Sequence, residues 1–181
     1  MRVLVRLPNW IGDAVMATPA LRAIRAGFPP GEHEIAALGR PDFFPMLEPA
    51  RWFDRAIPAP KKDAGWLAPL RLGRALAGDR FDLALLLPNS WSSAITALSA
   101  RIPRRIGYAQ AGRGVLLTER LHAPRIGRLR PVPMCDYYLA IAARAGCPVE
   151  RTGRLLELPA PPDALERALA YHRRLGIADG E

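Results

Sequence analysis

The first strand of the chain and the turn that follows it decide the fold. They read Arg2-Val3-Leu4-Val5-Arg6-Leu7 and then Pro8-Asn9-Trp10-Ile11-Gly12-Asp13. The nearly continuous apolar run is strand-length and is typical of a strand buried on both faces of a sheet. Apolar residues at helical spacing predict a helix from Asp13 to about Ala26, in which Pro19 should bend or tighten the first turn.

The same alternation of strand and helix continues along the chain. Strands are predicted at residues 33–38, 53–57, 81–87, 105–108 and 115–117, and helices at 66–77, 92–99, 136–145 and 163–175. Ser90 is expected to cap the helix at 92–99, Gly146 to end the helix at 136–145, and Asp163 with Glu166 to form a capping box. This order predicts a doubly wound, mainly parallel α/β sheet, whose ligands bind outside the carboxyl ends of the strands.

Composition indicates one folded domain. The chain has 181 residues, of which half are hydrophobic, two are cysteines, and the charged residues give a net charge of +9. A core of this size needs no disulfide or metal for stability. Residues 83–100 carry no charge, but a Pro-Asn-Ser turn interrupts them, so they are expected to form buried elements rather than a membrane span. No export signal is recognisable at the start, which makes the cytoplasm the expected location.

Eight arginines lie between residues 101 and 130, together with one acidic residue, Glu119. Such a stretch attracts phosphates and carboxylates, on nucleic acid, lipid headgroups or acidic sugars. A solvated surface is the alternative for these charges. A module that binds nucleic acid also stays open, although Tyr108 is the one aromatic residue available for base stacking in this stretch. Lys61, Lys62 and Trp66 are expected to belong to a core-packed helix with a basic rim, or else to meet a membrane surface.

The turn after the first strand places a carboxylate, Asp13, at the mouth of the sheet. It holds a single glycine, Gly12, and therefore lacks the glycine pattern of a dinucleotide-binding or phosphate-binding loop. Two interpretations of Asp13 remain. It is either the N-cap of the following helix or a general base that accepts a proton as the transition state forms.

The turn after the strand at 81–87 is rich in hydrogen-bonding groups. It reads Leu87-Pro88-Asn89-Ser90-Trp91-Ser92-Ser93-Ala94. Polar groups beside an indole suit a sugar, and turn chemistry with helix capping is the alternative. No pair of histidines has ligand spacing and no Asp-x-Asp pair occurs, so neither a metal nor a cofactor is predicted.

Three ordered motifs resemble the N-terminal half of the ADP-heptose:lipopolysaccharide heptosyltransferases, glycosyltransferase family 9, and heptosyltransferase II most of all. The motifs are Leu7-Pro8-Asn9-Trp10-Ile11-Gly12-Asp13-Ala14-Val15-Met16-Ala17-Thr18-Pro19-Ala20-Leu21, the turn at 87–94, and Ile102-Pro103-Arg104-Arg105-Ile106-Gly107-Tyr108 with Arg113-Gly114-Val115-Leu116-Leu117. The resemblance implies a GT-B protein with two Rossmann-like domains. Residues 1–160 would be the domain that holds the acceptor, and residues 161–181 a helix leading to the boundary with a domain that holds the sugar nucleotide.

The resemblance also implies the chemistry. Asp13 would deprotonate an acceptor hydroxyl, and heptose would pass from ADP-heptose to a heptosyl-Kdo-lipid A acceptor with inversion. The substrate-binding residues expected from these motifs are Asn9, Trp10, Gly12, Asn89, Ser90, Arg105 and Arg113, with Arg104 as a weaker candidate. Arg120, Arg125, Arg128 and Arg130 match no motif, and they would favour an anionic membrane surface.

The motifs that contact ADP in this family are absent from the chain, which is therefore expected to be inactive alone. A related transferase with another sugar donor would share every motif described above. That alternative stays open, because the donor is selected by the other half of the protein.

Overall fold

The computed structural model describes residues 1–60, 64–123, 132–158, 160 and 163–175. Within these residues six strands form one sheet in the order β3-β2-β1-β4-β5-β6, and every neighbouring pair is parallel. The strands are β1 (Arg2–Arg6), β2 (Glu34–Gly39), β3 (Arg55–Pro58), β4 (Leu83–Leu86), β5 (Arg104–Tyr108) and β6 (Glu119–Leu121). This is the strand order of a doubly wound nucleotide-binding fold, which confirms the predicted fold class.

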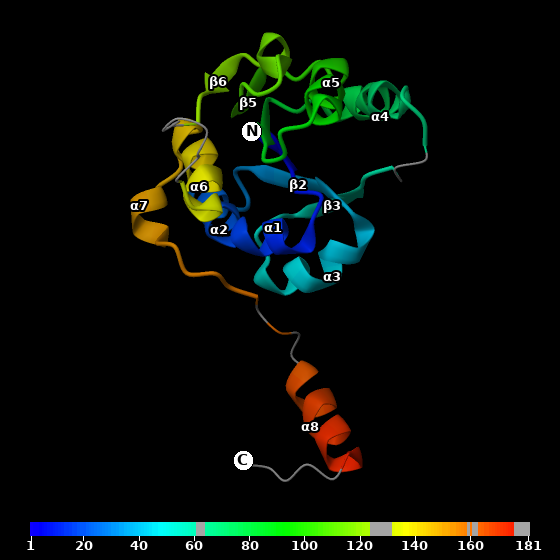
Figure 1. Ribbon diagram of the computed structural model, residues 1–181, viewed down its shortest axis with the longest axis vertical. Coiled ribbons are helices and arrows are strands. Elements are labelled where there is room, and N and C mark those ends of the chain that lie inside the picture. The colour runs from blue at the N-terminus through cyan, green and yellow to red at the C-terminus, as the bar shows by residue number, and fades with distance from the viewer. Residues whose placement is uncertain (61–63, 124–131, 159, 161–162, 176–181) are drawn as a thin grey trace.

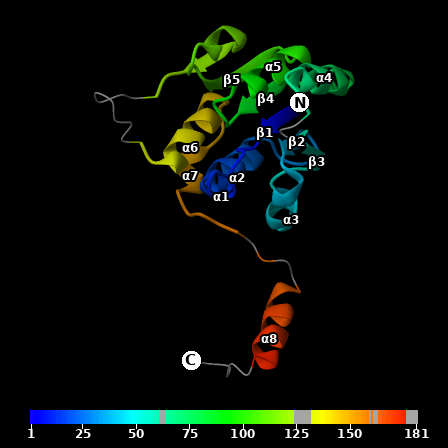
Figure 2. The same cartoon turned by 45° about the vertical axis from the view of Figure 1, so that its right-hand side comes forward.

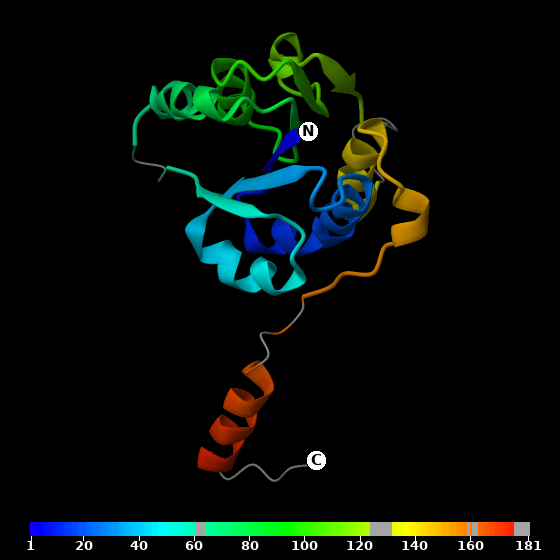
Figure 3. The same ribbon diagram turned by 180° about the vertical axis from the view of Figure 1, so that it is seen from behind.

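Helices cover both faces of the sheet (Figures 1 and 2). One face carries α1 (Ile11–Met16), α2 (Thr18–Gly27), α3 (Phe44–Leu47), α6 (Met134–Arg144) and α7 (Val149–Thr152), and the other carries α4 (Ala68–Leu76) and α5 (Trp91–Ser99). Side chains alternate along β1, so Val3 and Val5 pack toward α2 and α6 whereas Leu4 packs toward α4 and α5. The view from behind shows the same two layers (Figure 3).

The first predicted helix is two helices. It breaks at Ala17, and Pro19 lies at the start of α2, where a missing backbone N–H costs no hydrogen bond. The expectation that Pro19 disturbs the helix is confirmed, in the stronger form of a break. Ser90 caps α5 by accepting a hydrogen bond from the Ser93 N–H, and Gly146 follows α6 with a φ of +88°, both as predicted.

Residues 115–117 are not the predicted strand. Residues Arg113–Leu116 form a 3-10 helix, and the last strand of the sheet follows it at Glu119–Leu121. Two residues with positive φ, Ala111 and Gly112, turn the chain just before this helix. The turn directs the Arg113 side chain inward and leaves Val115 72% exposed, so the apolar run does not mark a buried strand.

The last described helix, α8 (Ala164–Arg174), lies apart from the sheet (Figure 1). The predicted capping box is wrong, because Asp163 makes no side-chain cap and instead pairs with Arg167 at 3.2 Å. His172 is exposed on this helix. No helix among the described residues combines the length and the apolar character needed to cross a bilayer. The division of the chain at residue 160 stays a prediction.

Candidate functional site

A pocket opens where the strand order reverses, between the carboxyl ends of β1 and β4. Its volume is about 270 Å³, near the lower end of the volumes typical of small-molecule sites. The turns after β1 and β4 were predicted to form the site, and both line this pocket. The lining residues are Pro8, Asn9, Trp10, Asp13, Leu87, Pro88, Asn89, Ser90, Met134 and Tyr138.

Asp13 is a half-buried residue in the first turn of α1. The N-cap position belongs to Trp10, and no side chain caps this helix, so the N-cap interpretation of Asp13 is wrong. Within the described residues the Asp13 carboxylate forms no hydrogen bond or ion pair. It therefore faces the pocket with its oxygens available to a ligand.

Asn9 is held in place by an arginine that the sequence interpretation passed over. The Arg6 Nη2 donates to the Asn9 Oδ1 at 2.8 Å, and the Arg6 Nη1 donates to the carbonyl oxygens of Leu7 and Leu38. Burial lowers the pKa of the Arg6 guanidinium to about 10. The signal was an arginine at the end of an otherwise apolar strand, where a charged side chain needs buried partners.

Asn89 and Ser90 line the pocket, but the protein itself uses their side chains. The Asn89 Oδ1 accepts from the Arg113 Nη2 at 3.2 Å, and the Asn89 Nδ2 donates to the Tyr137 hydroxyl at 2.6 Å. The Ser90 Oγ accepts from the Ser93 N–H and from the Ser92 hydroxyl. Their hydrogen bonds therefore shape the wall of the pocket, as the alternative of turn chemistry predicts.

Arg113 is the main correction to the predicted site. It was expected to touch the acceptor, yet its side chain is 0% exposed. The Arg113 Nε donates to the Tyr108 carbonyl at 2.9 Å, and its Nη1 donates to the carbonyl oxygens of Pro88 and Ser90 and to the Ser93 hydroxyl. Burial lowers the pKa of Arg113. The guanidinium lies beneath the turn at 88–90 and holds it from inside.

Arg105 does not line the pocket either. It pairs with Ala84 in the sheet, before the carboxyl end of β5. Its Nε donates to the Leu116 carbonyl and its Nη1 donates to the Ile102 carbonyl, so it braces the 3-10 helix, and burial lowers its pKa. The predicted contact of Arg105 with the acceptor stays a prediction, and it would have to lie outside this pocket.

The other candidate residues occupy different places. Trp10 is 70% exposed at the rim of the pocket, and Gly12 lies in α1 with open space around it. Arg104 pairs with Glu119, and Arg120 is exposed on β6. Five basic candidates fall outside the described residues: Lys61, Lys62, Arg125, Arg128 and Arg130.

Tyr138 is a lining residue that the sequence interpretation missed. It comes from α6, which the sequence predicted as a helix at 136–145 without any role in the site, and it is 3% exposed. Burial raises the pKa of its phenol, and the negative charge of Asp13 raises it further. A tyrosine within an apolar helical stripe carries no sequence signal that separates a pocket residue from a core residue.

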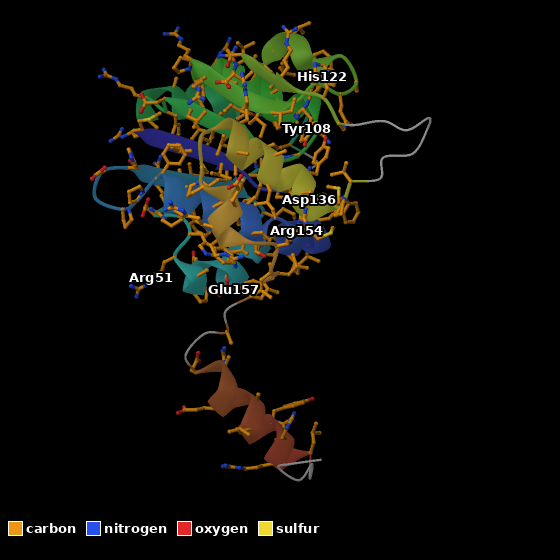
Figure 4. The ribbon with its side chains drawn as sticks, turned by 90° about the vertical axis from the view of Figure 1, so that its left-hand side faces the viewer. Arg51, Tyr108, His122, Asp136, Arg154 and Glu157 are labelled. Carbon is orange, nitrogen blue, oxygen red and sulfur yellow. The ribbon has the colours of Figure 1, made fainter. Side chains whose placement is uncertain are left out.

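The neighbouring Tyr137 joins α6 to the turns at the carboxyl edge. Its ring stacks on the ring of Tyr108 with centroids 3.6 Å apart, and its hydroxyl accepts from Gln110 as well as Asn89. Tyr108 lies beside α6 in Figure 4, where the ion-paired Asp136 and Arg154 are also labelled. Tyr137 thus ties α6 to Tyr108 at the end of β5, to Gln110 in the loop after β5 and to Asn89 in the turn after β4.

A broader and shallower hollow of about 450 Å³ lies at the opposite edge of the sheet, lined by Met1, Arg2, Gly31, Glu32, His33, Glu34 and Asp82. Ligands of this fold bind at the carboxyl ends of the strands, and this hollow lies at the amino ends. The described residues hold no group of three His, Cys, Asp or Glu side chains arranged to bind a metal ion.

Comparisons with known proteins show which family the chain belongs to. Residues 69–161 match the family described as glycosyltransferase family 9 (heptosyltransferase). Lipopolysaccharide heptosyltransferase 2 of Escherichia coli (strain K12) is 32% identical over 165 residues, which cover 89% of this chain and 44% of that protein.

Solved structures show the same relationship. The E. coli ADP-heptose LPS heptosyltransferase II superposes with a TM-score of 0.70 at 26% identity, over 99% of this chain and 52% of that one. The glycosyl transferase family 9 structure from Veillonella parvula DSM 2008 has a TM-score of 0.78 over 99% of this chain and 51% of that one, and at 18% identity this likeness concerns the fold alone. The chain spans about half the length of the relatives that it matches. It belongs to glycosyltransferase family 9, the heptosyltransferase family.

Proposed function

We propose that this chain is the acceptor-binding half of a heptosyltransferase of lipopolysaccharide inner-core synthesis. Heptose passes from ADP-heptose to a heptosyl-Kdo-lipid A acceptor, with inversion at the anomeric carbon. The observation that carries the proposal is the half-buried Asp13 carboxylate, which lacks a partner in the described residues and faces a pocket at the reversal point of the sheet. The names of the relatives, which refer to lipopolysaccharide and ADP-heptose, support the substrate class.

The pocket supplies the acceptor side of a single displacement. An acceptor hydroxyl donates to the Asp13 carboxylate, and its proton moves to Asp13 as its oxygen forms a bond to the anomeric carbon of the donor. The bond from that carbon to the diphosphate breaks on the opposite face, and ADP leaves with the electron pair. Inversion follows, because the base and the leaving group lie on opposite faces of the sugar.

Asp13 suits this role because its oxygens are not committed elsewhere. A carboxylate already paired with an arginine is stabilised in its charged form and takes up a proton less readily. The arginines nearest the site, Arg6 and Arg113, instead donate to carbonyl oxygens and to the side chains of Asn9, Ser93 and Asn89. They shape the turns without pairing with the base.

Positive charge outside the pocket fits an anionic acceptor. The chain carries a net charge of +9, and Arg120 is exposed on β6. Guanidinium groups bind phosphates and carboxylates, both of which an inner-core acceptor carries. We therefore propose that the protein works in the cytoplasm, at the anionic inner face of the membrane. A nucleic-acid partner is not expected, because Tyr108 is the one aromatic residue available for base stacking in residues 101–130.

The direct test replaces the proposed base. The chain is produced together with the donor-binding half of a family relative, and transfer of heptose is measured for the wild type, Asp13→Asn and the control Asp42→Asn. Asp13→Asn is expected to lower kcat by about 10²- to 10⁴-fold, because a general base contributes that much, while acceptor affinity changes little. Asp42 is exposed and pairs with Arg40, so its variant should keep full activity.

A loss below tenfold in kcat, accompanied by a lower melting temperature, would show that Asp13 serves the fold only.

A titration of the chain with short DNA and with an inner-core oligosaccharide addresses the nucleic-acid alternative. Micromolar binding of DNA without binding of the oligosaccharide would contradict the proposed function.

A further inference from the structure

The polar side chains of the pocket divide into those the protein uses and those it leaves available. The Asn89 side chain is bonded to Arg113 and Tyr137, the Ser90 hydroxyl is bonded to Ser92 and Ser93, and the Asn9 Oδ1 is bonded to Arg6. Three groups on the pocket wall form no hydrogen bond with any described residue, namely the Asp13 carboxylate, the Tyr138 hydroxyl and the Asn9 Nδ2. The first two also lie close enough for the charge of Asp13 to raise the pKa of Tyr138.

The Tyr138 hydroxyl reaches the pocket. Fully buried side-chain nitrogens and oxygens without a partner occur among the described residues, and the Tyr138 hydroxyl is not one of them. A hydroxyl that has no described partner and is not fully buried must touch solvent, and the pocket is the hollow that Tyr138 lines. The residue as a whole is 3% exposed, so the rest of the side chain is packed within the protein.

Tyr137 and Tyr138 have different surroundings on α6. Consecutive helical residues point about 100° apart. The Tyr137 hydroxyl accepts hydrogen bonds from the side chains of Asn89 and Gln110. Tyr138 instead lies near Asp13 of α1, whose negative charge raises the pKa of the Tyr138 phenol. The pair therefore offers a test residue and a chemically identical control on one helix.

The Asp13 carboxylate and the Tyr138 hydroxyl have complementary hydrogen-bonding abilities. A carboxylate only accepts, whereas a neutral phenol donates as well. Burial and the Asp13 charge both keep the phenol neutral, so it remains a donor at neutral pH. An acceptor and a donor on the wall of one small pocket match two hydroxyl groups of the same sugar.

We propose that Tyr138 is a substrate-contacting residue of the acceptor site, whose hydroxyl donates a hydrogen bond to the sugar oxygen adjacent to the one that Asp13 deprotonates. The pocket then selects an acceptor with two neighbouring free hydroxyl groups. Tyr138 is assigned to the neighbouring oxygen rather than the reacting one, because a hydrogen bond donated to the reacting oxygen would lower its nucleophilicity. This assignment rests on the proposed function.

The test measures binding of a heptosyl-Kdo oligosaccharide to the full chain by calorimetry, for the wild type, Tyr138→Phe and Tyr137→Phe. A set of monodeoxy analogues, each lacking one hydroxyl of the terminal heptose, is titrated in parallel. Tyr138→Phe is expected to weaken binding of the parent sugar by about 3- to 12-fold, the range for one hydrogen bond. One analogue should bind the wild type more weakly by the same factor and lose no further affinity in Tyr138→Phe.

Such coupling to a single hydroxyl would not arise from a structural role. Tyr137→Phe should show no coupling to that hydroxyl, because its own hydroxyl is bonded within the protein. An equal loss for every analogue in Tyr138→Phe, or an unchanged affinity for the parent sugar, would overturn the proposal.

The two proposals fail in different ways. If Tyr138→Phe couples to one hydroxyl and Asp13→Asn keeps full transfer, the sugar contact stands and the assignment of the base is wrong. If Asp13→Asn abolishes transfer and Tyr138→Phe shows no coupling, the role of Tyr138 is wrong and that of Asp13 stands.

Discussion

At the scale of single residues, Arg113 determines the shape of the pocket. Its guanidinium joins the turn at 88–90 to the end of β5 through bonds to the Pro88, Ser90 and Tyr108 carbonyl oxygens. A buried cation is costly unless hydrogen bonds compensate it. Arg113 meets that condition with main-chain oxygens, which ties the position of the turn to a single side chain.

Replacement of Arg113 by methionine should therefore destabilise the protein. The variant removes the donors and leaves buried carbonyl oxygens unpaired, so the free energy of unfolding in urea should fall by about 3 kcal/mol. Arg120→Met is the matched control, because Arg120 is exposed on β6 and should change stability by less than about 0.5 kcal/mol. Equal unfolding midpoints for Arg113→Met and the wild type would mean that these bonds do not hold the turn.

The sequence located the pocket but not every residue that contacts it. Asp13 and the turns at 8–13 and 87–94 were predicted, because polar residues follow apolar strands and the carboxyl ends of parallel strands share one edge. Arg113 was misplaced, since an arginine in a polar loop looks exposed until its hydrogen-bond acceptors are known. Tyr138 was missed because a helical apolar stripe does not show which of its members reaches a cavity.

At the scale of elements, Glu119 joins β5, β6 and α6. Its carboxylate pairs with Arg104 at 2.5 Å and with Arg144 at 2.7 Å, and its side chain is 18% exposed. The hydrogen bond from Arg104, with the charges of both arginines, lowers the pKa of Glu119 below its ordinary value of 4.5. Solvent reaches these ion pairs and screens their charges, so they contribute only modestly to the free energy of unfolding.

The stability that Glu119 contributes should depend on pH. Because its pKa is lower in the folded state, the contribution is fully present above the unfolded value and is lost as the pH falls through the folded value. Glu119→Gln should therefore unfold at a lower urea concentration than the wild type at about pH 7, and the gap should close as the pH falls below 4.5. Glu150→Gln is the control and should follow the wild type, whereas a gap that is constant with pH would contradict the ion-pair origin.

The order of elements was predicted correctly, except where local geometry overrode the pattern. All five strands predicted before residue 110 are present, and the central strands β1, β2 and β4 have apolar runs that are buried on both faces. The strand predicted at 115–117 failed because the positive φ values of Ala111 and Gly112 redirect the chain. The Asp163 cap failed because its carboxylate pairs with Arg167 instead.

At the scale of the whole molecule, the sheet places chemistry at one edge. The strand order reverses between β1 and β4. The turns that follow these two strands enclose the pocket, and Asp13 lies in its wall. The arginines of residues 101–120 that the structure describes lie outside that pocket. We therefore assign the proposed recognition of a sugar to the pocket, and the proposed attraction of an anionic surface to a separate region of the chain.

The most direct test of this arrangement is a titration of the isotope-labelled chain with a heptosyl-Kdo oligosaccharide, followed by NMR. Amide shifts should concentrate at residues 9–13 and 87–90 and around Tyr138, because these segments line the pocket. Shifts confined to residues 101–120, or to the hollow around His33 and Asp82, would contradict the assignment of the acceptor site to Asp13.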